Sequence, residues 1–188
     1  MAQTLEDLLD ALEDVDDATR EEASKALGEL ADPATLEALI GACGDEYWTV
    51  RAHAGWGVAR IGGPKAVEAL IVLFNDSIME VRNEAVAAMA SMGATVVDRL
   101  IIALKDERWR VREHAAKTCG EIKDRKTVEA LIPVCRDRDG AVKSAVAEAL
   151  GKIGDPRAIT VLIKFFRDPS KTVRETAGTA LISIGQPS

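Results

Sequence analysis

Residues 106–116 read DERWRVREHAA, and the spacing within this stretch recurs along the whole chain. An aspartate is followed five residues later by Val-Arg or a close variant, and these pairs return every 30 or 31 residues. The pairs are Thr19-Arg20, Val50-Arg51, Val81-Arg82, Val111-Arg112, Val142-Lys143 and Val173-Arg174. A fixed period of this length is the signature of a repeat architecture. Six repeats therefore account for nearly the entire chain.

Each repeat is predicted to contain two helices. A leucine stands eleven residues before each pair, and in the second repeat Leu36, Leu39, Ile40 and Cys43 fall at i, i+3, i+4 and i+7. This spacing places apolar side chains on one face of a helix. After Val81 of the third repeat, apolar residues recur four, seven, eight and eleven positions later, which is again one helical face.

The residues between these apolar stretches are typical of helix ends. Prolines at 33, 64 and 156 occupy expected first helical positions, and glycines at 62, 93, 154 and 185 follow expected last turns. Pro133 is the exception, because it lies inside a predicted first helix, where we expect a local kink. The pattern leaves no place for strands.

A helix pair of this length cannot bury its apolar stripes alone, so successive pairs must stack into a solenoid. Five and nine residues after the valine position the side chains are nearly all small, which lets successive second helices approach closely. We therefore expect an all-α, single-domain α-solenoid over residues 1–188. The expected helix pairs cover residues 4–31, 32–62, 63–93, 94–123, 124–154 and 155–185.

The stretches at 106–116 and 147–155 resemble the short HEAT-like repeats of the phycobilisome (PBS) lyase type, and the resemblance covers residues 4–185. It implies a superhelix of HEAT-like repeats in which the recurring aspartates and arginines form a ladder of hydrogen bonds between loops and neighbouring helices. Such repeats serve as scaffolds, as chromophore-lyase subunits and as metal-dependent hydroxylases, so the resemblance specifies the fold better than the activity.

Composition indicates a folded protein with no membrane span. Of the 188 residues 47% are hydrophobic and 29% charged, with a net charge of −7. No run approaches the roughly 18 apolar residues that a membrane helix needs, and acidic residues follow the N-terminus. Three widely spaced cysteines argue against a disulfide framework. We expect a soluble, cytoplasmic, prokaryotic protein.

The candidate chemical groups favour structural roles. Cys43, Cys119 and Cys135 occupy repeat positions that other repeats fill with core residues. His53 and His114 share one repeat position on helices two steps apart, which separates them by about 20 Å. The hydroxylase of this fold uses several His-Glu dipeptides, whereas this chain has only the reversed Glu113-His114. We expect no catalytic residue, no metal and no cofactor.

Aromatic residues indicate a binding surface. All three tryptophans, the only tyrosine and both histidines fall at the start of the second helix of the second and fourth repeats. Helical geometry turns Trp56 away from the buried stripe, so we expect it to be exposed. Trp, Tyr and Arg are enriched at binding hot spots. The expected patch comprises Tyr47, Trp48, His53, Trp56, Arg60, Asn83, Glu84, Trp109, Glu113, His114 and Lys117.

Charge is distributed unevenly. Residues 1–31 carry 10 acidic and 2 basic side chains, whereas residues 99–174 carry 11 acidic and 18 basic ones. The basic half favours an acidic partner over nucleic acid, since the bases are scattered and the whole chain is acidic.

The sequence favours a non-enzymatic scaffold that binds a protein partner on a concave face formed by the second helices. We expect it to be a monomer or a weak homo-oligomer, with neither nucleic acid nor membrane as its partner. The alternative is a bilin (phycocyanobilin) lyase-like subunit, or a chaperone that handles a tetrapyrrole-bearing protein.

Overall fold

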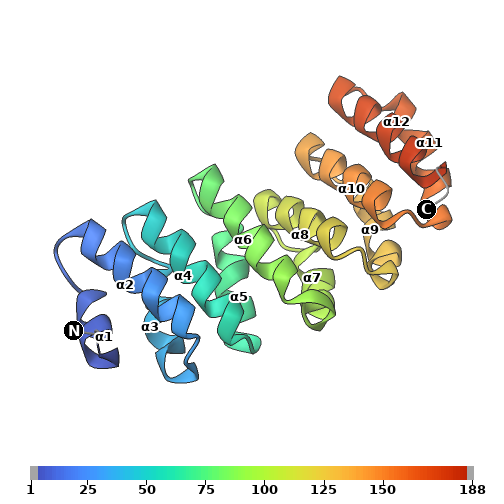
Figure 1. Cartoon of the computed structure of the whole chain (residues 1–188). Helices are drawn as coiled ribbons and strands as arrows, with labels where there is room; N and C mark the ends of the chain where they lie inside the picture. The colour runs from blue at the N-terminus through green and yellow to red at the C-terminus, as the bar shows by residue number, and fades with distance from the viewer. Residues whose placement is uncertain (1–3, 186–188) are drawn as a thin grey trace. The chain divides into compact units, whose positions relative to one another are not determined.

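The computed structural model describes residues 4–185, which are helical apart from loops and contain no strand (Figure 1). Within this described part of the chain, twelve α-helices alternate as six pairs, which confirms the predicted all-α solenoid. The first helices are α1 (Leu5–Ala11), α3 (Leu36–Ala42), α5 (Pro64–Leu73), α7 (Val97–Ala103), α9 (Val128–Val134) and α11 (Ile159–Lys164). The second helices are α2 (Asp17–Leu30), α4 (Trp48–Ile61), α6 (Met79–Ser91), α8 (Trp109–Ile122), α10 (Gly140–Ile153) and α12 (Lys171–Gly185).

Short 3₁₀ turns precede or extend several first helices. They are η1 (Pro33–Thr35), η2 (Gly93–Val96), η3 (Arg125–Thr127), η4 (Pro156–Ala158) and η5 (Phe165–Arg167). Gly62, Gly93 and Gly154 have positive φ angles after second helices, as their sequence positions predicted. Pro133 lies inside α9, which covers the same repeat positions as α3 and α7. The proline therefore does not shorten its helix, and the kink stays a prediction.

The chain forms two compact units, unit 1 over residues 1–92 and unit 2 over residues 93–188. The boundary falls where the repeat spacing shortens, between Val81 and Val111. Within unit 1, α2, α4 and α6 lie side by side, and α1, α3 and α5 pack against them (Figure 1). Within unit 2, α8, α10 and α12 form the corresponding row, with α7, α9 and α11 against it. The single-domain organisation stays a prediction.

The core consists of the two predicted stripes. The leucine that stands eleven residues before each pair is buried in all six repeats, as at Leu39 and Leu131. The valines of the five Val-containing pairs are all fully buried. No single described helix is long and apolar enough to cross a membrane, although the bent pair of residues 79–91 and 93–103 reaches that length and apolar composition when taken together.

Small residues set the distance between neighbouring second helices. A Cβ atom built on Gly28 would lie 3.0 Å from the Cα of Gly57, and one on Gly151 would lie 2.8 Å from the Cα of Ala180. In both contacts, one residue stands nine positions after the valine position of its repeat. Its neighbour stands seven positions after the valine position of the next repeat. The close approach predicted from the sequence is therefore a backbone-to-backbone contact, which leaves no room for a larger side chain.

Replacing Gly151 by alanine should test this contact. The added methyl group collides with backbone, so we expect the Gly151→Ala variant to lose about 2 kcal/mol of unfolding free energy despite its higher helix propensity. Urea unfolding followed by circular dichroism measures the change. The control is Gly41→Ala in α3, where an added Cβ meets nothing within 4 Å. A Gly151→Ala variant as stable as the control would contradict the tight contact.

A ladder of ion pairs links consecutive repeats within each unit, as the resemblance implied. The Nε of Arg20 donates to Asp45 at 2.7 Å, and that of Arg51 donates to Asp76 at the same distance. In unit 2, Arg112 donates to Asp137 at 2.6 Å, and Lys143 pairs with Asp168. Each of the three arginines also donates from Nη1 to two carbonyl oxygens of its own repeat's loop. One guanidinium thus binds two loops together.

The ladder keeps its carboxylates ionised. The hydrogen bond from Arg20 lowers the pKa of Asp45 below its usual value. Burial works to raise the pKa of Asp76, but the hydrogen bonds from Arg51 and from the Ile78 amide outweigh it, and the pKa is lowered. The same balance lowers the pKa of Asp137. A carboxylate whose pKa is lower in the folded state than in the unfolded state stabilises the protein at pH values above its unfolded-state pKa. This stabilisation is lost as the pH falls through the folded-state pKa.

The protein should therefore lose stability in acid, below about pH 4. At neutral pH, Asp76→Asn leaves the largely buried Arg51 without its counter-charge, and we expect a loss of about 3 kcal/mol in unfolding free energy. Urea titrations at several pH values measure both effects, and the variant should show a shallower acid transition. Glu80→Gln, an exposed position nearby, is the control. Equal stability of the two variants would exclude a stabilising ladder.

Candidate functional site

The second helices of unit 1 bring part of the predicted patch together. Trp56 on α4 is half-buried and donates its Nε1 hydrogen to Glu84 of α6 at 2.8 Å. Arg60, Asn83 and Glu84 are exposed. Trp56 is less exposed than the helical geometry predicted, because its indole reaches the neighbouring helix. The result is an open surface with an aromatic centre and charged surroundings.

The two histidines are held by their own helices. The Nδ1 of His53, which is half-buried, lies 2.9 Å from the carbonyl oxygen of Thr49. The Nδ1 of His114 lies 2.7 Å from the carbonyl oxygen of Arg110, and the His114 side chain is only 2% exposed. His114 was expected in the binding patch, but its burial between helices makes it a core residue. Only His53 is in a position to touch a partner.

A second cluster of unit 1 lies at the N-terminal ends of α4 and α6. Tyr47 and Trp48 are 45% and 43% exposed, and the Arg20 guanidinium lies 5.6 Å from the Tyr47 ring centroid. Tyr47, Trp48 and Ile78 line a hollow of about 650 Å³. Sequence reasoning missed Ile78 and the neighbouring Met79, which is 56% exposed.

The repeat position of Tyr47 and Ile78 explains why this cluster is unusual. Both are the N-cap residues of their helices, and neither makes a side-chain capping bond. The equivalent Asp16 accepts a hydrogen bond from the Thr19 amide and caps α2. Replacing a capping side chain costs about 1 kcal/mol. These repeats therefore carry large side chains, exposed at Tyr47 and half-buried at Ile78, where a capping residue would be more stable.

Unit 2 exposes fewer of its predicted residues. Trp109 is 37% exposed, with the Arg110 guanidinium 4.8 Å from its ring centroid. Arg108, the N-cap residue of α8, likewise makes no capping bond. Lys117 pairs with Glu113 at 2.7 Å, and the Glu113 side chain is only 14% exposed. Trp109 is thus exposed and Lys117 is half-buried, whereas Glu113 is largely covered and paired with Lys117.

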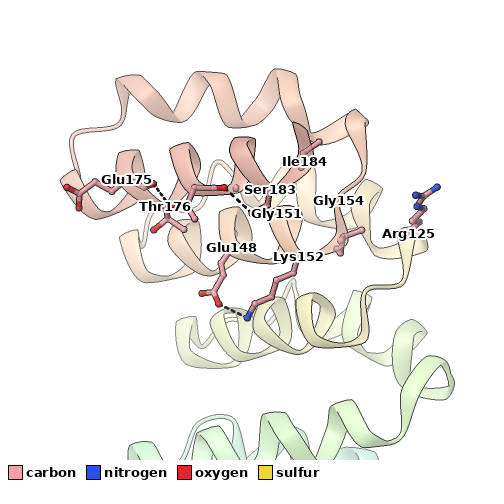
Figure 2. A pocket seen from close by; sticks show the side chains of 12 residues that line it. Arg125, Glu148, Gly151, Lys152, Gly154, Glu175, Thr176, Ser183 and Ile184 are labelled. Carbon is pink, nitrogen blue, oxygen red and sulfur yellow. Dashed lines mark hydrogen bonds and ion pairs between the residues drawn. The ribbon is translucent and has the colours of Figure 1, made fainter. Parts of the chain in front are cut away.

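A larger hollow of about 830 Å³ lies on α10 and α12 of unit 2, and sequence reasoning missed it (Figure 2). Its polar centre is Lys152, which donates to Glu148 at 2.6 Å and to Glu121 at 2.8 Å. Burial works to lower the pKa of Lys152, but these hydrogen bonds outweigh it and the pKa is raised. Lys152 therefore stays charged, which suits it to binding and not to nucleophilic chemistry.

The cysteines are unsuited to catalysis. All three are buried free thiols, and burial raises the pKa of Cys43, Cys119 and Cys135 to about 12 in each case. A thiol with such a pKa has almost no thiolate at neutral pH. Among residues 4–185, no three His, Cys, Asp or Glu side chains are grouped so as to hold a metal ion.

Thiol labelling should confirm this assignment. We expect the three cysteines to react with a disulfide reagent at least about a hundredfold more slowly in the folded protein than in denaturant, because the thiolate is suppressed and covered. Release of the reagent's chromophore measures the rate. A Ser77→Cys variant, at an exposed position, supplies a fast internal standard. Native labelling of all three at the standard's rate would show that the helices open readily.

Comparison with known proteins identifies the repeats. The sequence profile of HEAT repeats matches residues 5–90 and 97–182, which together cover most of the chain. Among curated proteins, none matches the sequence significantly.

Solved structures share the fold at low sequence identity. An engineered protein aligns over 97% of both chains with 23% identity and a TM-score of 0.53. The chain aligns over 96% of its length with 30% of Kap95p, solved bound to RanGDP, at 14% identity and a TM-score of 0.72. One chain of the CpcE–CpcF complex of phycocyanin lyase from Nostoc sp. PCC7120 aligns over 99% of its length with 79% of this chain, at 23% identity and a TM-score of 0.60.

Proposed function

Since the chain belongs to the HEAT-repeat proteins, we propose that it is a non-enzymatic scaffold that binds a protein partner on the surface of its second helices, the concave face of the solenoid. The absence of a cofactor, a monomeric or weakly oligomeric state and a cytoplasmic location are parts of the same proposal.

The uncapped N-termini of α4 and α6 carry this proposal. Tyr47 and Trp48 occupy positions where Asp16 and Asp17 stand in the first repeat, and they leave α4 without a capping bond. A fold selected for stability alone would keep the cap. Large aromatic side chains that remain nearly half exposed are typical of binding hot spots. Trp56, further along α4, extends this surface toward Glu84 of α6.

The test separates binding from folding with a Tyr47→Ser variant. A serine at the N-cap supplies the missing hydrogen bond and offsets the lost contact with Arg20, so we expect the unfolding free energy to stay within about 1 kcal/mol of the parent. At a hot spot the same change should weaken the partner complex by about 2 kcal/mol or more. The partner is captured from native lysate, identified by mass spectrometry and titrated by calorimetry.

Two further variants complete this experiment. Trp56→Ala should also weaken binding, with a loss of about 1 kcal/mol in stability because its hydrogen bond to Glu84 disappears. Lys25→Ala, an exposed residue at the same repeat position in α2, is the matched control and should change neither quantity. Full binding by both Tyr47→Ser and Trp56→Ala would overturn the proposed surface.

The second candidate is a subunit of the bilin lyase type, related to PBS lyase HEAT-like repeats. Its support is the likeness in fold to one chain of the CpcE–CpcF complex. Nearly the whole length of that lyase chain aligns with this protein. Such a protein would take up phycocyanobilin or a tetrapyrrole-bearing protein on the same surface. Adding free phycocyanobilin and looking for a bound visible absorption band after gel filtration distinguishes this candidate from the scaffold.

A further inference from the structure

Unit 2 carries a hollow of about 620 Å³ lined by residues of its last two first helices and of the loops that follow them. It lies between α9 and α11, and Ile132, Val161 and Phe165 give it an apolar lining. Phe165 is 5% exposed and therefore fixed in the core, while Ile132 and Val161 are half-buried. An apolar side chain entering the hollow would meet a rigid wall.

The rim of this hollow is basic. Arg136, Lys164 and Arg167 are exposed, and over residues 4–185 the structure gives them no ion-pair partner. The two carboxylates at the hollow are already neutralised, because Asp137 binds Arg112 and Asp168 binds Lys143. The rim therefore presents three cationic groups whose charge nothing nearby cancels.

The repeat itself does not require these bases. Arg136 and Arg167 stand six residues before the valine position, where the first three repeats have Glu13, Gly44 and Asn75. All six repeats form the same helix–loop–helix, so the backbone tolerates an acid, a glycine or an amide at this position. The basic side chains of unit 2 consequently serve something other than the fold.

We propose that the hollow between α9 and α11 binds an acidic segment of a partner protein that inserts a large apolar side chain. The three bases attract the flanking carboxylates, and the lining of Ile132, Val161 and Phe165 holds the apolar side chain. Charge complementarity at the rim favours association and orients the segment, and the apolar anchor supplies the buried area. This site belongs to unit 2, whereas the cluster of Tyr47 and Trp48 belongs to unit 1, so separate variants test the two sites.

The probe for this site is a fluorescein-labelled peptide with a Leu-Phe pair between two runs of glutamate, followed by fluorescence anisotropy. The Lys164→Glu/Arg167→Glu variant reverses the rim charge and should weaken binding at least about tenfold. A Lys123→Glu/Lys126→Glu variant makes the same charge change at exposed residues of unit 2 outside the hollow, and should weaken binding less than about threefold. Replacing the Leu-Phe pair by Ala-Ala should also cost at least about tenfold.

A third variant guards against misfolding of the doubly reversed protein. Thr160→Glu places one acid at the exposed lip of the hollow and should weaken peptide binding several-fold with an unchanged circular dichroism spectrum. Tyr47→Ser should leave peptide binding unchanged, so failure here and failure of the second-helix surface are separable.

Four results would overturn the proposal. The first is an equal loss of peptide affinity in the two charge-reversed variants, and the second is that the Ala-Ala peptide binds as tightly as the Leu-Phe peptide. The third is a single-stranded oligonucleotide that binds more tightly and displaces the peptide. The fourth is self-association in sedimentation that the Lys164→Glu/Arg167→Glu change abolishes. The third would assign the rim to nucleic acid, and the fourth to a second copy of the chain.

Discussion

The close approach of successive second helices is the constraint on which the rest of each unit depends. Backbone meets backbone where Gly28 faces Gly57 and where Gly151 faces Ala180, and that contact fixes the distance and the stagger of neighbouring repeats. Once the helices are this close, the leucine and valine stripes of adjacent repeats meet and exclude water. The same closeness brings each ladder base within hydrogen-bond distance of the next repeat's aspartate. Packing and electrostatics thus share one geometric cause.

The ladder adds directionality that apolar packing cannot supply. An apolar stripe would tolerate small slides of one repeat against the next, whereas Arg51 must reach Asp76 with two nitrogens while donating to two carbonyls of its own loop. This network holds the loops in place, although the loops have few apolar residues of their own. The loop edge therefore becomes a rigid support on which exposed side chains such as Tyr47 and Trp48 keep a fixed position, and that rigidity reduces the entropy cost of binding.

Periodic features of the sequence predicted the fold well, because each depends on one repeat position alone. The helix pairs, the buried leucines and valines and the burial of all three cysteines follow from spacing. The candidate site was predicted less completely, because exposure at a surface position depends on the neighbouring helix. Trp56 is partly covered because Glu84 lies within reach, and His114 is buried although His53, at the same repeat position, is not. The repeat spacing of the sequence does not predict such pairings between neighbouring helices.

Departures from the repeat are therefore the most informative part of the surface. Tyr47 and Ile78 replace capping residues, and Arg136 and Arg167 replace neutral or acidic ones, while the backbone of their repeats stays the same. Such a change costs stability or leaves a charge unpaired without altering the helix–loop–helix. An interaction outside the folded chain therefore compensates for it. In unit 1 these changes are the N-cap residues of α4 and α6, and in unit 2 they are the bases that follow α9 and α11, together with the uncapped Arg108 of α8. Each unit can thus acquire its own partner while all six repeats keep one packing rule.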